Sequence, residues 1–134
     1  MAAGPENGAC RPRLERKEKM IIKAISVHQP WAQMIVQGFK TIETRTWNTE
    51  HRGDLLICST QLPEYPGVKC GFALCIVNLK NCRPMIPSDA AGARCEYRED
   101  LKLFAWVLTE LREITQFRVR GRQRIFEVEM ESDL

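Results

Sequence analysis

Short apolar segments separated by glycine, proline and polar residues constrain the fold of this chain more than any other feature of its sequence. Strand-like patterns, β-branched or alternating, cover residues 20–27, 40–47, 54–59, 72–79, 103–111 and 125–131. A helical pattern lies between Pro30 and Gly38, because proline suits a first helical turn and glycine an end. With no regular alternation of strand and helix, the pattern predicts an α+β protein: a small, mostly antiparallel β-sheet or barrel carrying one or two short helices.

The chain has the size of one domain. Its 134 residues, of which 44% are hydrophobic, suffice for one core. Residues 1–19 mix glycine and proline with charges and lack apolar periodicity, so they predict a disordered N-terminal extension. Residues 20–134 are then the single folded domain, and residues 81–100 within it are predicted to be a loop with one helical turn.

Cysteine, histidine and charge patterns exclude several classes of protein. The six cysteines include no Cys-x-x-Cys pair, and His28 and His51 lie far from any paired cysteines, so we expect reduced thiols, no metal and no cofactor. No apolar run reaches membrane-spanning length and no signal peptide is visible, so we expect a cytoplasmic protein without membrane contact, and a monomer. A net charge of +3 does not by itself indicate nucleic-acid binding.

Polar residues surround the start of the predicted helix. Ser26, His28 and Gln29 precede Pro30, and Trp31 follows it. The unpaired N–H groups at a helix N-terminus attract phosphate or carboxylate, so these residues are candidate ligand-binding groups. The alternative is that they only cap the helix.

The strand predicted over residues 40–47 carries the second candidate group. Strand periodicity places Glu43, Arg45 and Trp47 on one face and Ile42 on the other. Lys40 has the wrong parity, so either it still belongs to the turn after Gly38 or a β-bulge re-aims it toward them. A solvated strand face is the alternative interpretation, although tryptophan beside arginine suits base stacking.

A basic stretch precedes the last predicted strand. Arginine recurs at every second position, at Arg118, Arg120, Arg122 and Arg124. This stretch predicts a secondary basic edge that follows a phosphate backbone. The alternative pairs the arginines across a hairpin with the acidic residues Glu127, Glu129 and Glu131. Trp106, between Phe104 and Val107, is predicted to lie in the core.

The sequence Gly38-x-Lys40-x-x-Glu43-x-Arg45 resembles the signature of the ASCH domain family. Matching context is found in His28-Gln29-Pro30-Trp31-Ala32, Thr46-Trp47, Arg52-Gly53, Phe104-Ala105-Trp106 and Gly121. The resemblance implies a PUA-like β-barrel with a cleft beside the signature helix and strand, and a role in binding RNA or another nucleic acid. Carried over by position, Lys40, Glu43 and Arg45 are the motif residues, with Ser26, His28, Gln29, Trp31, Trp47 and Arg52 as neighbouring ligand-binding candidates.

Three functional hypotheses follow. The first is a module that binds single-stranded RNA or a modified nucleotide, with Arg45 on a phosphate and Lys40, Glu43 and Trp47 on a base or sugar. The second is a metal-independent hydrolase, a nucleoside amidohydrolase or ribonuclease, in which Lys40 or Glu43 serves as general base. Similar amidohydrolases act on acylated cytidine, but they carry threonine where this chain has Glu43. The third is a protein-interaction adaptor.

Overall fold

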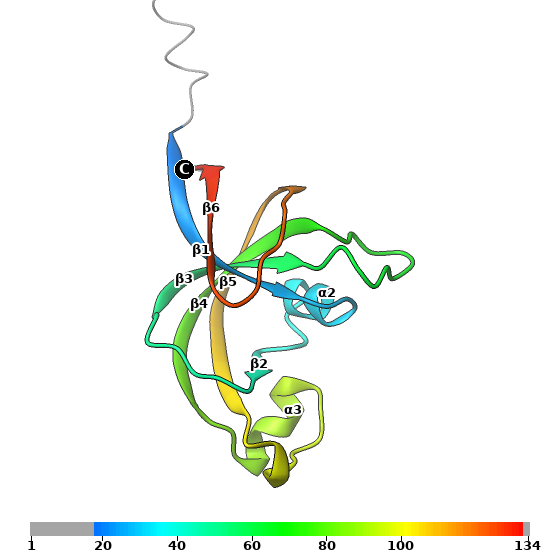
Figure 1. Cartoon of the computed structure of the whole chain (residues 1–134), viewed down its shortest axis with the longest axis vertical. Helices are drawn as coiled ribbons and strands as arrows, with labels where there is room; N and C mark the ends of the chain where they lie inside the picture. Colours follow the sequence, from blue (N-terminus) through cyan, green and yellow to red (C-terminus); the bar gives the residue numbers. More distant parts are fainter. Residues whose placement is uncertain (1–17, 133–134) are drawn as a thin grey trace, which may run out of the picture.

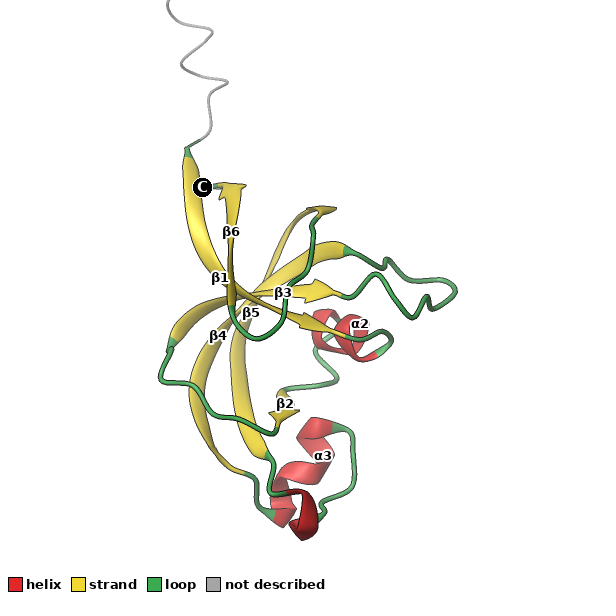
Figure 2. Cartoon of the chain, in the orientation of Figure 1, coloured by secondary structure: helices red, strands yellow, loops and turns green. Residues whose placement is uncertain are grey.

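The computed structural model describes residues 18–132, which form one bent sheet with short helices beside it (Figures 1 and 2). The strands are β1 (Lys19–Val27), β2 (Ile42–Arg45), β3 (Gly53–Ser59), β4 (Phe72–Pro84), β5 (Phe104–Arg118) and β6 (Phe126–Glu131). The helices are α2 (Trp31–Val36) and α3 (Ala90–Ala93), with 3-10 turns at Pro87–Asp89 and Glu99–Leu101. The α+β class is therefore confirmed.

The sheet is open. Its order is β2-β5-β4-β3-β1-β6, and only the β1–β3 pair is parallel. The predicted barrel is wrong on this point, because β2 and β6 are edges that do not pair with each other. Strand β2 has four residues, and the amide next to it, that of Thr41, donates to the Gly92 carbonyl of α3, so a helix borders this edge in place of a strand.

Strands β4 and β5 are longer than the apolar runs that predicted them. Strand β4 continues to Pro84 and β5 to Arg118, and their pairing shifts register at three places between Ala73 and Asn81. Such bulges bend a sheet and increase its twist. In Figure 1 the β1–β6 pair lies at one end of the bent sheet and β2 with α3 at the other.

The core lies on both faces of the sheet, because consecutive buried residues of one strand, such as Leu55 and Leu56, belong to different clusters. One cluster contains Ile25, Leu55, Leu79 and Trp106 and receives Ala32 and Ile35 from α2. The second lies among Ile22, Leu56, Ile76, Phe126 and Val128. In β6 the buried and exposed residues alternate along the whole strand, as its sequence predicted. Trp106 is 0% exposed, so its predicted place in the core is confirmed.

The structure bears on three further predictions, which concern the N-terminal extension, the loop over residues 81–100 and membrane-spanning helices. The extension predicted over residues 1–19 lies outside the described residues except for Glu18 and Lys19, and Lys19 already belongs to β1, where it pairs with Glu131. The loop predicted over residues 81–100 in fact holds the end of β4, two 3-10 turns and α3. Among residues 18–132, no helix has the length and apolar character needed to cross a membrane.

Candidate functional site

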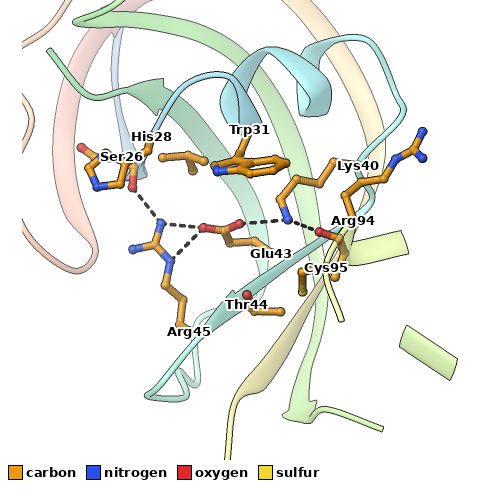
Figure 3. A pocket seen from close by; sticks show the side chains of 11 residues that line it. Ser26, His28, Trp31, Lys40, Glu43, Thr44, Arg45, Arg94 and Cys95 are labelled. Atoms are coloured by element: carbon orange, nitrogen blue, oxygen red, sulfur yellow. Dashed lines mark hydrogen bonds and ion pairs between the residues drawn. The ribbon is translucent and has the colours of Figure 1, made fainter. Parts of the chain in front are cut away.

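A cavity of about 430 Å³ opens between α2, β2, the end of β1 and the segment that follows α3 (Figure 3). Its lining is polar at the floor and aromatic at the mouth. The lining residues are Ser26, Val27, His28, Trp31, Lys40, Glu43, Thr44, Arg45, Ala93, Arg94 and Cys95. The structure therefore brings together six of the residues singled out by sequence: Ser26, His28, Trp31, Lys40, Glu43 and Arg45.

Glu43 is the centre of a charged chain on the cavity floor. Its carboxylate lies 3.5 Å from Lys40 Nζ through Oε1 and 2.9 Å from Arg45 Nη2 through Oε2. Lys40 and Glu43 are 5% and 8% exposed. Burying charges is costly unless they are paired, so this arrangement holds two cations and one carboxylate in a fixed geometry (Figure 3).

The turn after α2 brings Lys40 to this chain. Gly38 adopts φ +82°, a conformation that glycine takes without a steric penalty. The amides of Phe39 and Lys40 both donate to the Met34 carbonyl, which closes the turn. Lys40 then donates from Nζ to the Ala93 carbonyl at 2.6 Å and reaches Glu43 before β2 begins.

Arg45 joins two elements and keeps donors free for a ligand. Its Nε donates to Glu43 Oε2 at 3.1 Å, and its Nη2 donates to the Ser26 carbonyl of β1 at 2.7 Å. Among residues 18–132, Nη1 has no hydrogen-bond partner, so two N–H groups of the guanidinium remain. These donors are suited to an anionic group entering the cavity.

The mouth of the cavity carries an exposed aromatic ring and a third cation. Trp31 is 43% exposed at the first position of α2. Arg94, in a left-handed conformation at the end of α3, donates from Nε to the Phe39 carbonyl at 2.9 Å. His28 Nδ1 lies 2.8 Å from Thr60 Oγ1, and this hydrogen bond holds the imidazole beside the end of β3.

Sequence reasoning missed the contribution of α3. Ala93, Arg94 and Cys95 line the cavity, although their segment was predicted to be a loop. Gly92 favours this close approach, because a Cβ at this position would lie 2.9 Å from Thr41 Oγ1, but the glycine alone does not indicate which segment it contacts.

Three of the residues singled out by sequence lie elsewhere. Gln29 is 5% exposed and caps α2, since its Oε1 accepts from the Gln33 amide while its Nε2 donates to the Lys69 carbonyl. Trp47 packs edge-on against Trp106, because β2 has ended and its parity no longer applies. Arg52 donates to the carbonyls of Thr49, His51 and Cys82.

The basic edge is not a hairpin partner of β6. Strand β6 pairs with β1, and Glu127 forms its ion pair with Lys23, so the predicted alternative of arginine–glutamate pairs is wrong. Arg118 ends β5 and lies over the Phe72 ring, while Arg124 lies over the Trp47 ring. Within residues 18–132, Arg120 and Arg122 form no ion pair.

The turn that leads into α3 contains a buried carboxylate, Asp89, and this predicts acid sensitivity of the segment. Arg83 donates to both Asp89 oxygens and thereby holds the pKa of Asp89 below its ordinary value, with help from the Ile86 amide. A depressed folded pKa gives stability that is present above the unfolded pKa of about 3.9 and is lost as the pH falls through the folded pKa.

We therefore expect Asp89→Asn to be less stable than the wild type at pH 7, and the difference to narrow below about pH 4. Urea unfolding followed at several pH values measures this difference. Asp100→Asn, which breaks an exposed pair with Arg98, controls for the loss of one carboxylate. If the difference in free energy of unfolding between the wild type and Asp89→Asn stays constant from pH 7 to pH 3, the lowered pKa assigned to Asp89 is contradicted.

Comparisons with known proteins match this chain to one domain family. A family model described as the ASCH domain matches residues 25–118. Activating signal cointegrator 1 from Homo sapiens is 56% identical over 36 residues, and the Mus musculus protein is 53% identical over 36 residues. Each match takes up 27% of this chain and 6% of the relative, so the chain corresponds to a small part of those proteins.

Solved structures share the fold. The crystal structure of ASCH from Zymomonas mobilis has a TM-score of 0.60 and 14% identity, over 79% of this chain and 86% of the other. A single-residue mutant of the same protein has a TM-score of 0.58 and 15% identity, over 79% of this chain and 87% of the other. At this identity the likeness concerns the fold alone.

Proposed function

Because the chain belongs to the ASCH domain family, we propose that its cavity binds one nucleotide of a single-stranded RNA. ASCH domains have a PUA-like fold that is associated with RNA binding. The observation that carries the proposal is the combination, in one open cavity, of the exposed Trp31 with the charged chain Lys40–Glu43–Arg45.

The charges of the cavity favour a phosphate. The lining carries three cations, Lys40, Arg45 and Arg94, and one acidic residue, Glu43, which gives it a net charge of +2. Arg45 offers the unused Nη1 donors, and Arg94 stands exposed at the mouth. A guanidinium binds phosphate through paired N–H groups, so these two residues are the proposed phosphate contacts.

The shape and aromatic content favour a splayed-out base. A volume of about 430 Å³ lies in the range of small-ligand sites. Proteins that read single-stranded RNA stack unpaired bases on aromatic rings and bond the base edges with polar groups. Trp31 supplies the ring, and Glu43, Thr44 and Ser26 supply polar groups on the floor.

We expect Trp31→Ala to weaken binding of a short single-stranded RNA about 5- to 150-fold, the factor that corresponds to loss of one stacked base. Trp31→Phe should retain most of the affinity, because the aromatic face remains. Fluorescence anisotropy with an end-labelled oligonucleotide measures the dissociation constants, and a matched DNA oligonucleotide tests the contribution of the 2′-hydroxyl groups.

Leu111→Ala is the control for this experiment, because Leu111 is 40% exposed on β5 and lies outside the cavity. A second readout is Cys95, an exposed free thiol on the lining, whose alkylation bound RNA should slow. Equal affinities of the wild type and Trp31→Ala for RNA, with no protection of Cys95, contradict the proposal.

The hydrolase alternative has weaker support from the same geometry. Lys40 Nζ donates to the Ala93 carbonyl and forms an ion pair with Glu43 Oε1, while Glu43 Oε2 is paired with Arg45. Neither group therefore stands ready as a free base, and binding is the function that we propose. Turnover of N4-acetylcytidine or of unstructured RNA by the purified protein would favour hydrolysis.

A further inference from the structure

A strongly basic surface lies outside the cavity, on two segments that meet beside it. The loop between β3 and β4, with the start of β4, covers residues 61–72, and the end of β5 with the following loop covers residues 118–124. These segments carry Lys69 and four arginines against one acid, Glu64, a net charge of +4 in a chain whose total is +3. The rest of the chain is therefore slightly acidic, and the positive charge is concentrated here.

The two segments enclose a groove. One cavity of about 750 Å³ and another of about 420 Å³ share Gln61 and Arg118 in their linings, so they lie next to each other. We call this surface the loop groove and define it by Gln61, Tyr65, Lys69, Phe72, Arg118 and Arg120. A hydrogen bond from the Val119 amide to the Gly71 carbonyl, 3.0 Å long, joins its two sides.

Aromatic and cationic side chains alternate in the loop groove. Lys69 Nζ lies 5.0 Å from the centre of the Phe72 ring, and the Arg118 guanidinium lies 4.9 Å from it. Tyr65 is 44% exposed on the same lining. Cations that follow a phosphate backbone, with aromatic rings between them for bases, are the usual components of a surface that binds single-stranded nucleic acid.

Neighbouring residues link the loop groove to the cavity. The Ser26 hydroxyl, which lines the cavity, donates to the Arg122 carbonyl at 3.5 Å, and a Cβ at Gly121 would lie 2.7 Å from Ser26 Oγ. On the other side, Gln29 Nε2 donates to the Lys69 carbonyl at 2.7 Å. Arg120 of the loop groove and Arg122, whose carbonyl accepts from Ser26, are both exposed, so positive charge continues from the groove toward the cavity.

We propose that the loop groove is a second subsite for the same strand: Lys69, Arg118 and Arg120 bind successive phosphates, and Tyr65 stacks a base. This inference rests on the proposed function of the cavity and extends it from one nucleotide to a segment of RNA. Charge complementarity selects a polyanion, and the exposed aromatic ring selects one that carries bases.

The test is the triple variant Lys69→Gln, Arg118→Gln and Arg120→Gln, measured with a single-stranded RNA of about eight nucleotides. Loss of three phosphate contacts should lower the slope of log affinity against log salt by about 2 and lower the affinity at least about tenfold at moderate salt. Binding of a dinucleotide in the cavity, followed by protection of Cys95, should stay within about twofold of the wild type. The single variant Arg120→Gln should show about a third of the change in slope.

Lys23→Gln, Lys80→Gln and Arg112→Gln combined form the matched control, because they remove the same charge from exposed positions outside both sites. Tyr65→Ala separates stacking from charge: it should weaken binding of the RNA but not of an abasic backbone of equal length. Equal salt slopes for the triple variant and the control overturn the second subsite alone. Failure of the wild type to bind the dinucleotide or the longer RNA overturns the proposed function together with it.

Discussion

Glu43→Ala should reduce the free energy of unfolding by about 3–5 kcal/mol, because it leaves two cations on the cavity floor without their carboxylate. Lys40 is 5% exposed and loses its ion-pair partner, keeping only the Ala93 carbonyl. Arg45 loses both of its contacts with Glu43 Oε2. Urea unfolding monitored by circular dichroism measures the loss, and the midpoint should fall without a large change in the slope of the transition.

The matched control is Glu127→Ala, which breaks an exposed pair with Lys23 and should cost less than about 1 kcal/mol. If Glu43→Ala does not fold, Glu43→Gln keeps the shape of the side chain and reports the loss of charge alone. A double-mutant cycle with Lys40→Ala and Glu43→Gln should give a coupling energy of at least about 0.5 kcal/mol. If Glu43→Ala and Glu127→Ala lowered the free energy of unfolding equally, or if the coupling energy were near zero, the charged chain would not stabilise the cavity.

Local sequence patterns predicted those elements whose structure is determined by residues adjacent in the sequence. The alternation in residues 126–131 specified which face of β6 is buried, and the proline–glycine pair bracketed α2 to within a few residues. The ends of β4 and β5 were missed because polar residues such as Lys80 and Arg83 interrupt the apolar pattern there. Pairing between the two long strands keeps these segments in the sheet despite their polarity.

Local sequence patterns could not predict whether the sheet closes into a barrel. An open sheet and a barrel need the same apolar runs, and the difference lies in whether the two edge strands meet. Here the β2 edge is occupied by α3 through the Thr41–Gly92 hydrogen bond, a contact between segments distant in sequence. Gly92 permits it sterically, but a glycine in a predicted loop does not reveal its partner.

The geometry of the charged chain followed from strand parity. Glu43 and Arg45 share a face, as a period of two requires, and Lys40 reaches them through the turn after Gly38. Parity failed for Trp47, because β2 ends at Arg45 and the chain turns its tryptophan into the core. Arg94 and Cys95 reach the cavity only through the tertiary position of α3, so no spacing in the sequence could have assigned them.

Trp106→Ala should be the most destabilising single change in the core, at about 3–5 kcal/mol. Trp106 is fully buried, packs edge-on against Trp47 with ring centres 4.8 Å apart, and donates from Nε1 to the Trp47 carbonyl at 3.3 Å. Its partner across the β2–β5 pair is Glu43, so both side chains lie on the same face of the sheet. Removal of the indole therefore leaves a void beside Glu43, on the face of the sheet that carries the cavity floor.

Two variants separate packing from surface effects in this prediction. Trp106→Phe keeps most of the volume but leaves the Trp47 carbonyl without its donor, so it should cost about 1–3 kcal/mol. Trp31→Ala removes the same side chain from an exposed position and should change stability by less than about 1 kcal/mol while it weakens RNA binding. We expect the order of thermal stability to be wild type, Trp31→Ala, Trp106→Phe and Trp106→Ala. If Trp106→Ala proved as stable as Trp31→Ala, the indole would not support β2, and the position of Glu43 would have to depend on the turn after Gly38 and on Arg45 alone.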